Sequence, residues 1–276
     1  MIIDTHAHIF PDKIASKTIS ALALSANTKA YLDGTVSALS NSVEESGISL
    51  ALSLPVVTKP SQFDSINAFA LSVNERFNKG ESKILSFGGI HPDCEDIEEK
   101  FKWLKANGFK GIKLHPEYQG VFIDEEKTLR LLSLAKENSL ITVVHAGVDG
   151  AYRETEVKCT PKRVKNALKK LNGYENLILA HFGGNELFDE VYEVLAGEKV
   201  YFDTAYMLKY ISEKDFKKML EKHSADRILF ATDSPWSSQS EDIKILKSFN
   251  LKAEDEQKIF SKNALKLLGL EEYYVK

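Results

Sequence analysis

The chain has 276 residues, of which 43% are hydrophobic and 28% are charged. This composition is too apolar for a disordered segment, and 15 glycines with 7 prolines exclude a collagen-like or low-complexity polymer. Its 36 basic and 40 acidic side chains give a net charge of −4, whereas a duplex-binding protein normally carries a basic excess. No apolar run approaches the roughly 18 residues that a membrane span needs. The length is close to the ~250 residues of one α/β barrel.

The cysteine content and the N-terminus both bear on the compartment. Only two cysteines occur, Cys94 and Cys159, and they are far apart in the sequence. This indicates a reducing compartment rather than a disulfide framework, and we expect neither cysteine to take part in chemistry. The segment Met1–His6 has neither the basic nor the apolar region of a signal peptide. We therefore expect a cytoplasmic protein.

Eight short stretches rich in β-favouring residues predict strands. Several of them, such as Leu177–Phe182, are apolar at nearly every position, which is typical of parallel strands covered on both faces. The eight predicted strands are Ile2–Ile9, Ile48–Val57, Ile84–His91, Phe109–His115, Leu140–Ala146, Leu177–Phe182, Val200–Ala205 and Ile228–Asp233.

Stretches with helical periodicity lie between the predicted strands. In Asp96–Asn107, the apolar residues Ile97, Phe101 and Leu104 follow at steps of three and four, and Gly108 comes next as a stop. The other predicted helices are Asp124–Asn138, Thr160–Gly173, Glu213–His223 and Glu254–Leu268.

The alternation of strands and helices predicts an α/β fold, a single (β/α)₈ TIM barrel that occupies residues 1–276 as one domain. A doubly wound open sheet is the alternative, and it is less favoured because no glycine-rich phosphate turn follows the first strand. The segment Phe10–Gly47 is longer than one helix requires. We expect an insertion there, a loop with one or two helices over the barrel mouth.

Six of the seven histidines lie in or at the end of predicted strands. In a TIM barrel the carboxyl ends of the strands form the face on which active sites are built. The first strand ends in His6-Ala7-His8, and because side chains alternate along a strand, Asp4, His6 and His8 share one face. Two imidazoles side by side at a strand end can chelate one divalent ion.

Three later strands also end in an ionisable residue, namely His145, His181 and Asp233. Such an ending is costly for a buried strand unless the ionisable group is paired or bound to a metal ion. The alternative is that these groups only form hydrogen bonds with the neighbouring loops. The full set of strand ends favours a shared site.

The order His6-x-His8, His145, His181, Asp233 resembles the amidohydrolase superfamily of metal-dependent barrel enzymes. The segments GFKGIKLHP, VVHAG, LAHFGG and ATDSPW are similar to its amidohydrolase-related branch, which includes aminocarboxymuconate semialdehyde decarboxylase-like enzymes. The resemblance covers essentially the whole chain. It implies that His6, His8, His145 and Asp233 bind a zinc-type ion and that His181 acts beside the bound water.

The chemistry of these residue types agrees with that implication. Three imidazoles and one carboxylate suit one Zn²⁺ ion, and Mn²⁺ or another first-row ion also fits. Such an ion lowers the pKa of a bound water to about 7, so that Asp233 could accept its proton while His181 orients the water. Asp4 either accepts a hydrogen bond from an imidazole or is a buried structural carboxylate.

The number of metal ions depends on the fourth predicted strand. Binuclear members of the superfamily usually bridge two ions through a carboxylated lysine or a glutamate on a middle strand. Here Lys113 and His115 share a face, so a carbamate on Lys113 is conceivable, but the strand ends in His115. We therefore favour one ion, with a Lys113-bridged pair as the alternative.

Four residues near strand ends are candidates for substrate binding. His115 is expected to contact the substrate, and Arg153 on a mouth loop could bind a substrate carboxylate with two hydrogen bonds. Tyr118 and Trp236 follow strand ends and could line the pocket. The alternative for Arg153 is that it is a solvated charge on a loop. The alternative for Tyr118 and Trp236 is that they pack under loops.

Two histidines are less informative. His91 lies at the third strand end and either serves the site or orders its loop. His223 lies near a predicted helix C-terminus, where the helix dipole favours a cation, and it is assigned no function.

The leading hypothesis is a metal-dependent hydrolase that attacks an amide, a lactone or a related carbonyl of a small molecule. The alternative is a metal-dependent non-oxidative decarboxylase, and a third hypothesis is a barrel that binds metal or metabolite without catalysis. The expected partner is a small-molecule substrate rather than nucleic acid or a membrane, and a homodimer is left open. Specificity would come from the loops Phe10–Gly47 and Val148–Thr160, or from a neighbouring subunit.

Overall fold

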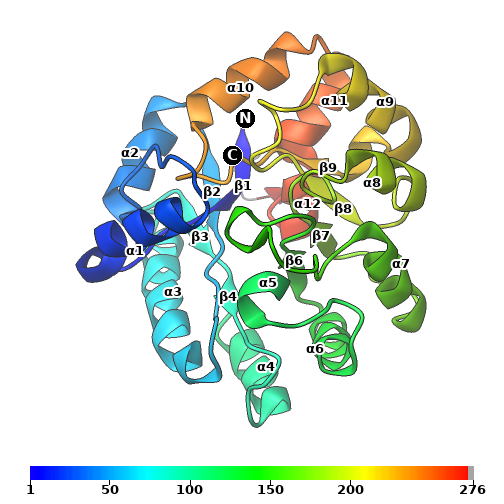
Figure 1. Ribbon diagram of the computed structural model, residues 1–276. Helices are drawn as coiled ribbons and strands as arrows, with labels where there is room; N and C mark the ends of the chain where they lie inside the picture. The colour runs from blue at the N-terminus through cyan, green and yellow to red at the C-terminus, as the bar shows by residue number, and fades with distance from the viewer. Residues whose placement is uncertain (273–276) are drawn as a thin grey trace.

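The computed structural model describes residues 1–272. Parallel strands lie in the middle, and helices surround them (Figure 1). The strands are β1 (Ile3–Ala7), β2 (Leu50–Ser53), β3 (Ile84–Ser86), β4 (Gly88–Gly89), β5 (Gly111–Leu114), β6 (Ile141–Val144), β7 (Leu177–Leu179), β8 (Tyr201–Asp203) and β9 (Ile228–Leu229).

The helices follow the strands along the chain. The α-helices are α1 (Asp12–Ser25), α2 (Val36–Glu45), α3 (Phe63–Asn78), α4 (Ile97–Ala106), α5 (Pro116–Gln119), α6 (Glu126–Glu137), α7 (Pro161–Lys170), α8 (Phe188–Val194), α9 (Glu213–His223), α10 (Gln239–Ser248), α11 (Ala253–Gln257) and α12 (Asn263–Leu268). Short turns are η1 (Pro60–Gln62), η2 (Gly150–Tyr152), η3 (Ala225–Arg227) and the π-helical turn η4 (Lys258–Lys262), which joins α11 to α12.

The strands pair in chain order in two parallel sheets, β1-β2-β3 and β4 through β9. Only Phe87 separates β3 from β4, and its N–H donates to the Ser53 carbonyl at 2.9 Å, so the two pieces form one interrupted strand. At the other seam, Thr5 N–H donates to Phe230 at 3.0 Å and Asp233 N–H donates to His6 at 2.8 Å. The last strand therefore lies beside the first. This confirms the TIM barrel and excludes the open sheet.

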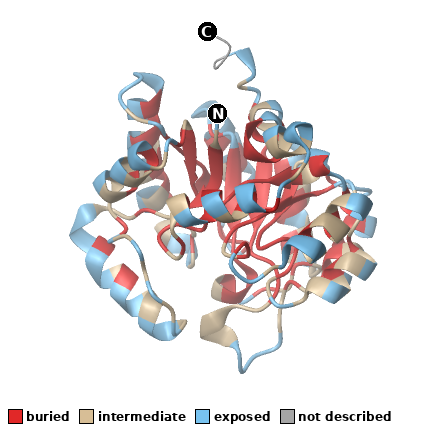
Figure 2. Cartoon of the chain, turned by 90° about the horizontal axis from the view of Figure 1, so that it is seen from above, coloured by how far each residue is buried: buried red, intermediate tan, exposed pale blue. Residues whose placement is uncertain are grey.

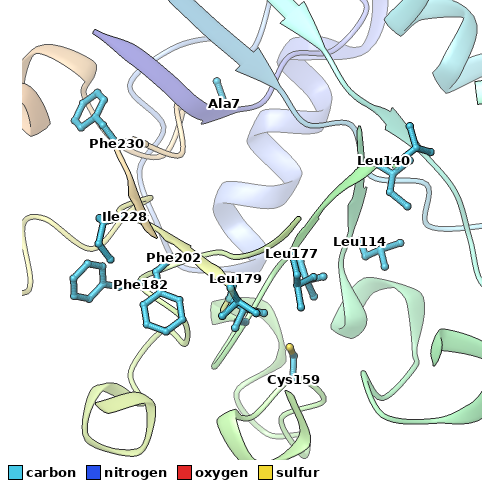
Figure 3. Close-up of a cluster of buried hydrophobic side chains, with 14 of the residues drawn as sticks. Ala7, Leu114, Leu140, Cys159, Leu177, Leu179, Phe182, Phe202, Ile228 and Phe230 are labelled. Carbon is cyan, nitrogen blue, oxygen red and sulfur yellow. The ribbon is translucent and has the colours of Figure 1, made fainter. Parts of the chain in front are cut away.

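Residues of one strand alternate between two buried layers. Ile178 belongs to an inner cluster with residues from most other strands, whereas Leu177 and Leu179 belong to the layer between strands and helices. Figure 3 shows that outer layer, with Phe182 and Phe202 in it. Figure 2 shows the buried central strands and the exposed outer sides of the helices. The inner cluster fills much of the barrel interior.

The segment after the first strand contains two helices, α1 and α2, as the sequence predicts. Ala26, which follows α1, packs against Gly150 in the loop after β6. The contact is so close that a Cβ atom on Gly150 would lie 2.9 Å from the Ala26 carbonyl oxygen. Both mouth loops named from the sequence thus contact each other. Among the described residues, no helix has the length and apolar character that crossing a membrane requires.

Candidate metal centre and active site

Three of the predicted strand-end residues meet at the carboxyl end of the barrel. His6 Nε2 lies 3.2 Å from His8 Nε2, and Asp233 Oδ1 lies 3.1 Å from His8 Nε2 and 3.4 Å from His6 Nε2. Ligands at about 2.0–2.2 Å from one tetrahedral ion are roughly 3.4 Å apart. These three residues, called the metal trio below, therefore have the spacing of a common ion site.

The hydrogen bonds of the two imidazoles decide which nitrogens are free. His6 Nδ1 lies 2.8 Å from Asp203 Oδ2, and His8 Nδ1 lies 2.9 Å from the Leu54 carbonyl oxygen. Both acceptors require a proton on Nδ1, which leaves each Nε2 unprotonated, with a lone pair that can bind a cation. The Lys113 amine donates to the lone pair of His6 at 3.0 Å. Two lone pairs and a carboxylate oxygen in mutual contact repel one another unless a cation lies between them. The trio thus fits a metal ion.

Asp203 is a site residue that the sequence analysis did not single out. It is fully buried, and its Oδ1 accepts the backbone N–H groups of His181 at 2.9 Å and Ala205 at 3.1 Å. Burial raises its pKa, while His181 and Lys113 oppose the shift. It ends an apolar strand as His145 does, so the same strand-end pattern could have identified it.

Of the two roles considered for Asp4, the structure shows that of a buried structural carboxylate. Its carboxylate accepts hydrogen bonds from the Thr232 hydroxyl at 2.6 Å, the Gln239 amide at 2.7 Å and the backbone N–H groups of Thr232 and His6. Burial raises its pKa to about 6. No imidazole N–H reaches it, because Asp203 accepts that bond from His6 instead.

Lys113 points into the barrel beneath the trio. Its side chain is fully buried, and Nζ lies 3.0 Å from His6 Nε2. Burial lowers its pKa to about 8. An amine at this position contacts the trio directly, and a carbamate on Lys113 remains a prediction.

Asp233 and His181 both occupy left-handed backbone conformations, at φ 66° and φ 58°. Residues other than glycine adopt this region at an energetic cost and do so often at functional sites. The left-handed turns lie where the chain leaves the barrel after β9 and β7, which directs both side chains toward the mouth.

A family model described as Amidohydrolase matches residues 3–270. The chain belongs to the amidohydrolase family. The resemblance inferred from the strand-end residues is confirmed, and membership places the chain in a family of metal-dependent enzymes. Among curated protein sequences, no match to this chain is found.

Solved structures of amidohydrolase-related proteins share the fold. A putative 2-pyrone-4,6-dicarboxylic acid hydrolase from Pseudomonas putida has a TM-score of 0.66 at 16% identity, with 98% of each chain covered. A 2,6-dihydroxybenzoate decarboxylase from Rhizobium has a TM-score of 0.68 at 15% identity, covering 98% of this chain and 99% of that one. A dihydroxybenzoic acid decarboxylase from Polaromonas, with bound manganese, has a TM-score of 0.69 at 14% identity, covering 100% and 99%.

The fourth predicted ligand, His145, lies outside the trio. His181 Nδ1 is 3.0 Å from the Ala205 carbonyl oxygen, so it carries the proton, and His181 Nε2 accepts from His145 Nδ1 at 2.9 Å. This leaves His145 Nε2 bare. It is buried and has no hydrogen-bond partner among the described residues, and it faces Asp149 at 3.9 Å. A ligand role of His145 toward the trio's ion remains a prediction.

His115 and His145 form a second histidine group at this end of the barrel. Their rings stack at 4.1 Å with 13° between the planes, and His115 Nε2 lies 3.4 Å from Asp149 Oδ2. Burial, followed by neighbouring positive groups, lowers the pKa of both imidazoles well below the usual value. Both rings are therefore neutral. Tyr118 contacts His115 edge-on at 4.3 Å, and its role in a substrate pocket stays a prediction.

The remaining predicted substrate residues lie farther out. Arg153 forms a two-bond ion pair with Glu186, and the Arg153 side chain is 56% exposed. This favours the interpretation of Arg153 as a loop charge. Trp236 is half-buried, and its backbone N–H donates to the Asp233 carbonyl at 2.8 Å. His91 Nδ1 accepts the Asp93 backbone N–H at 3.1 Å, as expected of a loop-ordering residue.

His223 differs from the expectation of a cation at a helix end. It is the last residue of α9, but it is buried and stacks on Phe202 at 3.8 Å with 2° between the ring planes. Burial, followed by the charge of Arg227, lowers its pKa to about 4. Desolvation therefore outweighs the helix dipole, and the ring is neutral.

Proposed function

We propose that this chain is a metal-dependent hydrolase of a small-molecule amide, lactone or ester-like substrate. The supporting observation is the metal trio, in which the unprotonated Nε2 atoms of His6 and His8 face the Asp233 carboxylate at 3.4 and 3.1 Å, respectively. A divalent ion, with Zn²⁺ as the best fit and Mn²⁺ or another first-row ion as alternatives, would supply Lewis acidity and a water whose pKa is near 7. The sequence adds His145 as a fourth ligand.

The chain's own residues have separate tasks in this proposal. Asp203 holds the His6 ring through Nδ1, and the Leu54 carbonyl holds the His8 ring. Asp233 accepts the proton of the attacking water at its carboxylate. His181, whose ring is fixed by the Ala205 carbonyl, would orient the substrate or the water through Nε2 when that atom is released from His145.

Substrate contacts are proposed for the second histidine group and the loops around it. His115 and Tyr118 contact each other at the mouth of the barrel. Trp236 lies three residues after Asp233 in the sequence. Arg153 would have to leave Glu186 to bind a substrate. The proposal includes a small-molecule substrate and a single domain, and it leaves a homodimer open.

Decarboxylation is the second candidate, and Lys113 favours it. This buried amine lies 3.0 Å from the trio, so a substrate carboxylate bound there would find a cation without any surface arginine. In that reaction CO₂ leaves and a proton takes its place on carbon, and no water attacks. The solved structures from Rhizobium and Polaromonas are named as decarboxylases of related acids.

One experiment separates the candidates. The purified protein is incubated in ¹⁸O-labelled water with a panel of lactones, esters, amides and aromatic acids. A hydrolase incorporates ¹⁸O into the product, and a decarboxylase releases CO₂ without doing so.

The double variant His6→Ala/His8→Ala tests the metal site. It should contain at least one equivalent of metal less than the wild type, and full metal retention in it would contradict the proposal. Bound metal without turnover on the whole panel would favour a non-catalytic barrel.

A further inference from the structure

The inward face of α10 begins with two polar side chains. The buried residues of this helix are Gln239, Asp242, Ile243 and Leu246. Residues at such steps of three and four lie on one side of a helix. Gln239 and Asp242 are each only 1% exposed, and Gln239 Oε1 and Asp242 Oδ2 have no hydrogen-bond partner among the described residues. A buried polar atom without a partner costs free energy, so each of these two oxygens requires a donor.

The orientation of the Gln239 amide is set by Asp4. Gln239 Nε2 donates to Asp4 Oδ2 at 2.7 Å. The reverse orientation would turn the amide oxygen toward a carboxylate oxygen, and neither of these atoms can donate. Gln239 Oε1 therefore points away from Asp4 and is free to accept a second hydrogen bond.

Asp242 can supply that hydrogen bond only as a neutral acid. An ionised carboxylate accepts hydrogen bonds and donates none. Burial raises the pKa of Asp242 to about 7, although a hydrogen bond from the Ser237 side chain opposes the shift. The neutral acid is therefore the main form below pH 7. One proton on Asp242, donated to Gln239 Oε1, would give both oxygens their missing partner.

The charged groups around Asp242 come from three elements. Asp4 of β1 and Glu241 of α10 raise the pKa of Asp242, and Lys209, in the loop between β8 and α9, lowers it. The helix α2 also packs against α10, and its buried residues are both aliphatic. Two negative groups thus face the Asp242 carboxyl against one positive group, which favours its neutral form.

Asp4 connects this pair of side chains to the metal trio. Its Oδ1 accepts the backbone N–H of His6 at 3.2 Å and that of Thr232 at 3.0 Å. His6 belongs to the trio, and Thr232 directly precedes Asp233 in the sequence. The Asp4 carboxylate therefore fixes the backbone of both strand ends that carry the trio.

We propose that Asp242 stays protonated in the folded protein up to neutral pH and donates its proton to Gln239 Oε1. Through the Gln239 amide and the Asp4 carboxylate, this acid–amide–carboxylate chain positions the two strand ends for the metal ion. Gln239 and Asp242 are positioning residues, because they act through Asp4 and not on the ion or the substrate. The positioning role rests on the proposed function, whereas the proton on Asp242 does not.

Urea unfolding of the metal-free full chain between about pH 4 and pH 7 tests the proton. An unfolded aspartate has a pKa of about 3.9, so over this range the folded wild type holds one proton more than the unfolded chain. The unfolding constant of the wild type should rise by up to about tenfold per pH unit relative to that of Asp242→Asn, which cannot titrate. The matched control Glu241→Gln removes an exposed carboxylate from the same turn and should follow the wild type. Parallel curves for the wild type and Asp242→Asn would overturn the proposal.

Zinc affinity at about pH 6, measured by chelator competition on variants that circular dichroism shows to be folded, tests the positioning role. Asp242→Asn should bind zinc as tightly as the wild type, because its amide can donate to Gln239 Oε1 as the acid does. Asp242→Leu, which has no donor, and Gln239→Met, which cannot bond to Asp4, should each bind zinc about tenfold more weakly. Glu241→Gln should bind zinc as the wild type does.

The outcomes distinguish this proposal from the proposed function. If Gln239→Met or Asp242→Leu binds zinc as tightly as the wild type, the chain does not position the trio, and the proposal fails while the trio stands. Equal losses in Asp242→Asn and Asp242→Leu would also contradict it, because the amide should restore the hydrogen bond. Should Asp242→Leu not fold, Gln239→Met and Asp242→Asn still decide. If the wild type binds no zinc, the proposed function and the positioning role both fail, and the unfolding curves still decide the proton.

Discussion

The neutral, buried imidazole of His223 should make the free energy of unfolding depend on pH by an amount that can be calculated. Its ring stacks on Phe202 at 3.8 Å, and its Nδ1 accepts the Gly197 backbone N–H at 3.2 Å. Its pKa is about 4 in the folded protein, whereas an unfolded chain has a histidine pKa of about 6.5. Replacing His223 with asparagine removes the titrating group and keeps an acceptor for Gly197.

The sign and size follow from the two pKa values. A histidine whose pKa falls on folding stabilises the protein fully above about pH 6.5, and this stabilisation is lost as the pH falls toward 4. The pKa difference between about 6.5 and about 4, at about 1.4 kcal/mol per unit, amounts to about 3–4 kcal/mol, of which about 3 kcal/mol is lost by pH 4. Wild-type unfolding free energy should therefore fall by about 3 kcal/mol more than that of His223→Asn between pH 7 and pH 4.

Urea unfolding of both metal-free proteins at several pH values measures this difference. The other titrating groups are common to the two proteins, so they cancel when the two curves are subtracted. The variant should be less stable at pH 7, because it loses the stacking on Phe202, and the gap should close toward pH 4. Parallel curves across this range would show that His223 is not held neutral by burial.

Three further predictions concern the site, its rim and the core. Asp203→Asn should weaken zinc binding about 10–100-fold, measured by chelator competition, because the amide cannot hold the His6 ring as the carboxylate does. Arg153→Ala should change kcat/KM less than twofold, since Arg153 is paired with Glu186 at the surface; a loss above tenfold would place it on the substrate. Leu179→Ala should lower the unfolding free energy by about 2–5 kcal/mol in a urea titration, because Leu179 is fully buried.

The barrel and the metal trio could be predicted because their signals are local. A strand covered on both faces is apolar along its length, so the ionisable residue that ends it stands out, as His6 and Asp233 do. The insertion between Phe10 and Gly47 was equally visible from its length alone. The helices α3, α8 and α10 occupy stretches for which no helix range was predicted. The buried face of α3 includes the polar residues Asn67 and Asn74, and α8 has only seven residues.

The partners of the ligands could not be predicted, because they come from distant strands. Asp4 and His6 share one face of β1, as the sequence predicts. Asp4 lies two residues before His6, however, which is about 6.6 Å deeper in the barrel. At that depth it meets Thr232 and Gln239 instead. Asp203 reaches His6 from the strand β8, 197 residues away in sequence. Only the closed ring of strands determines which carboxylate faces which imidazole.

The end of β8 orients both histidine groups, although it contributes no ligand to the metal trio. Asp203 Oδ2 fixes the proton of His6, and Asp203 Oδ1 holds the backbone of His181 at 2.9 Å. The Ala205 carbonyl fixes the His181 tautomer, which in turn leaves His145 Nε2 bare. Asp203→Asn should therefore disturb His181 as well as His6, because an amide cannot accept hydrogen bonds at both of its ends. We expect kcat/KM of this variant to stay below the wild-type value even at saturating zinc. Full recovery at saturating zinc would show that Asp203 acts through His6 alone.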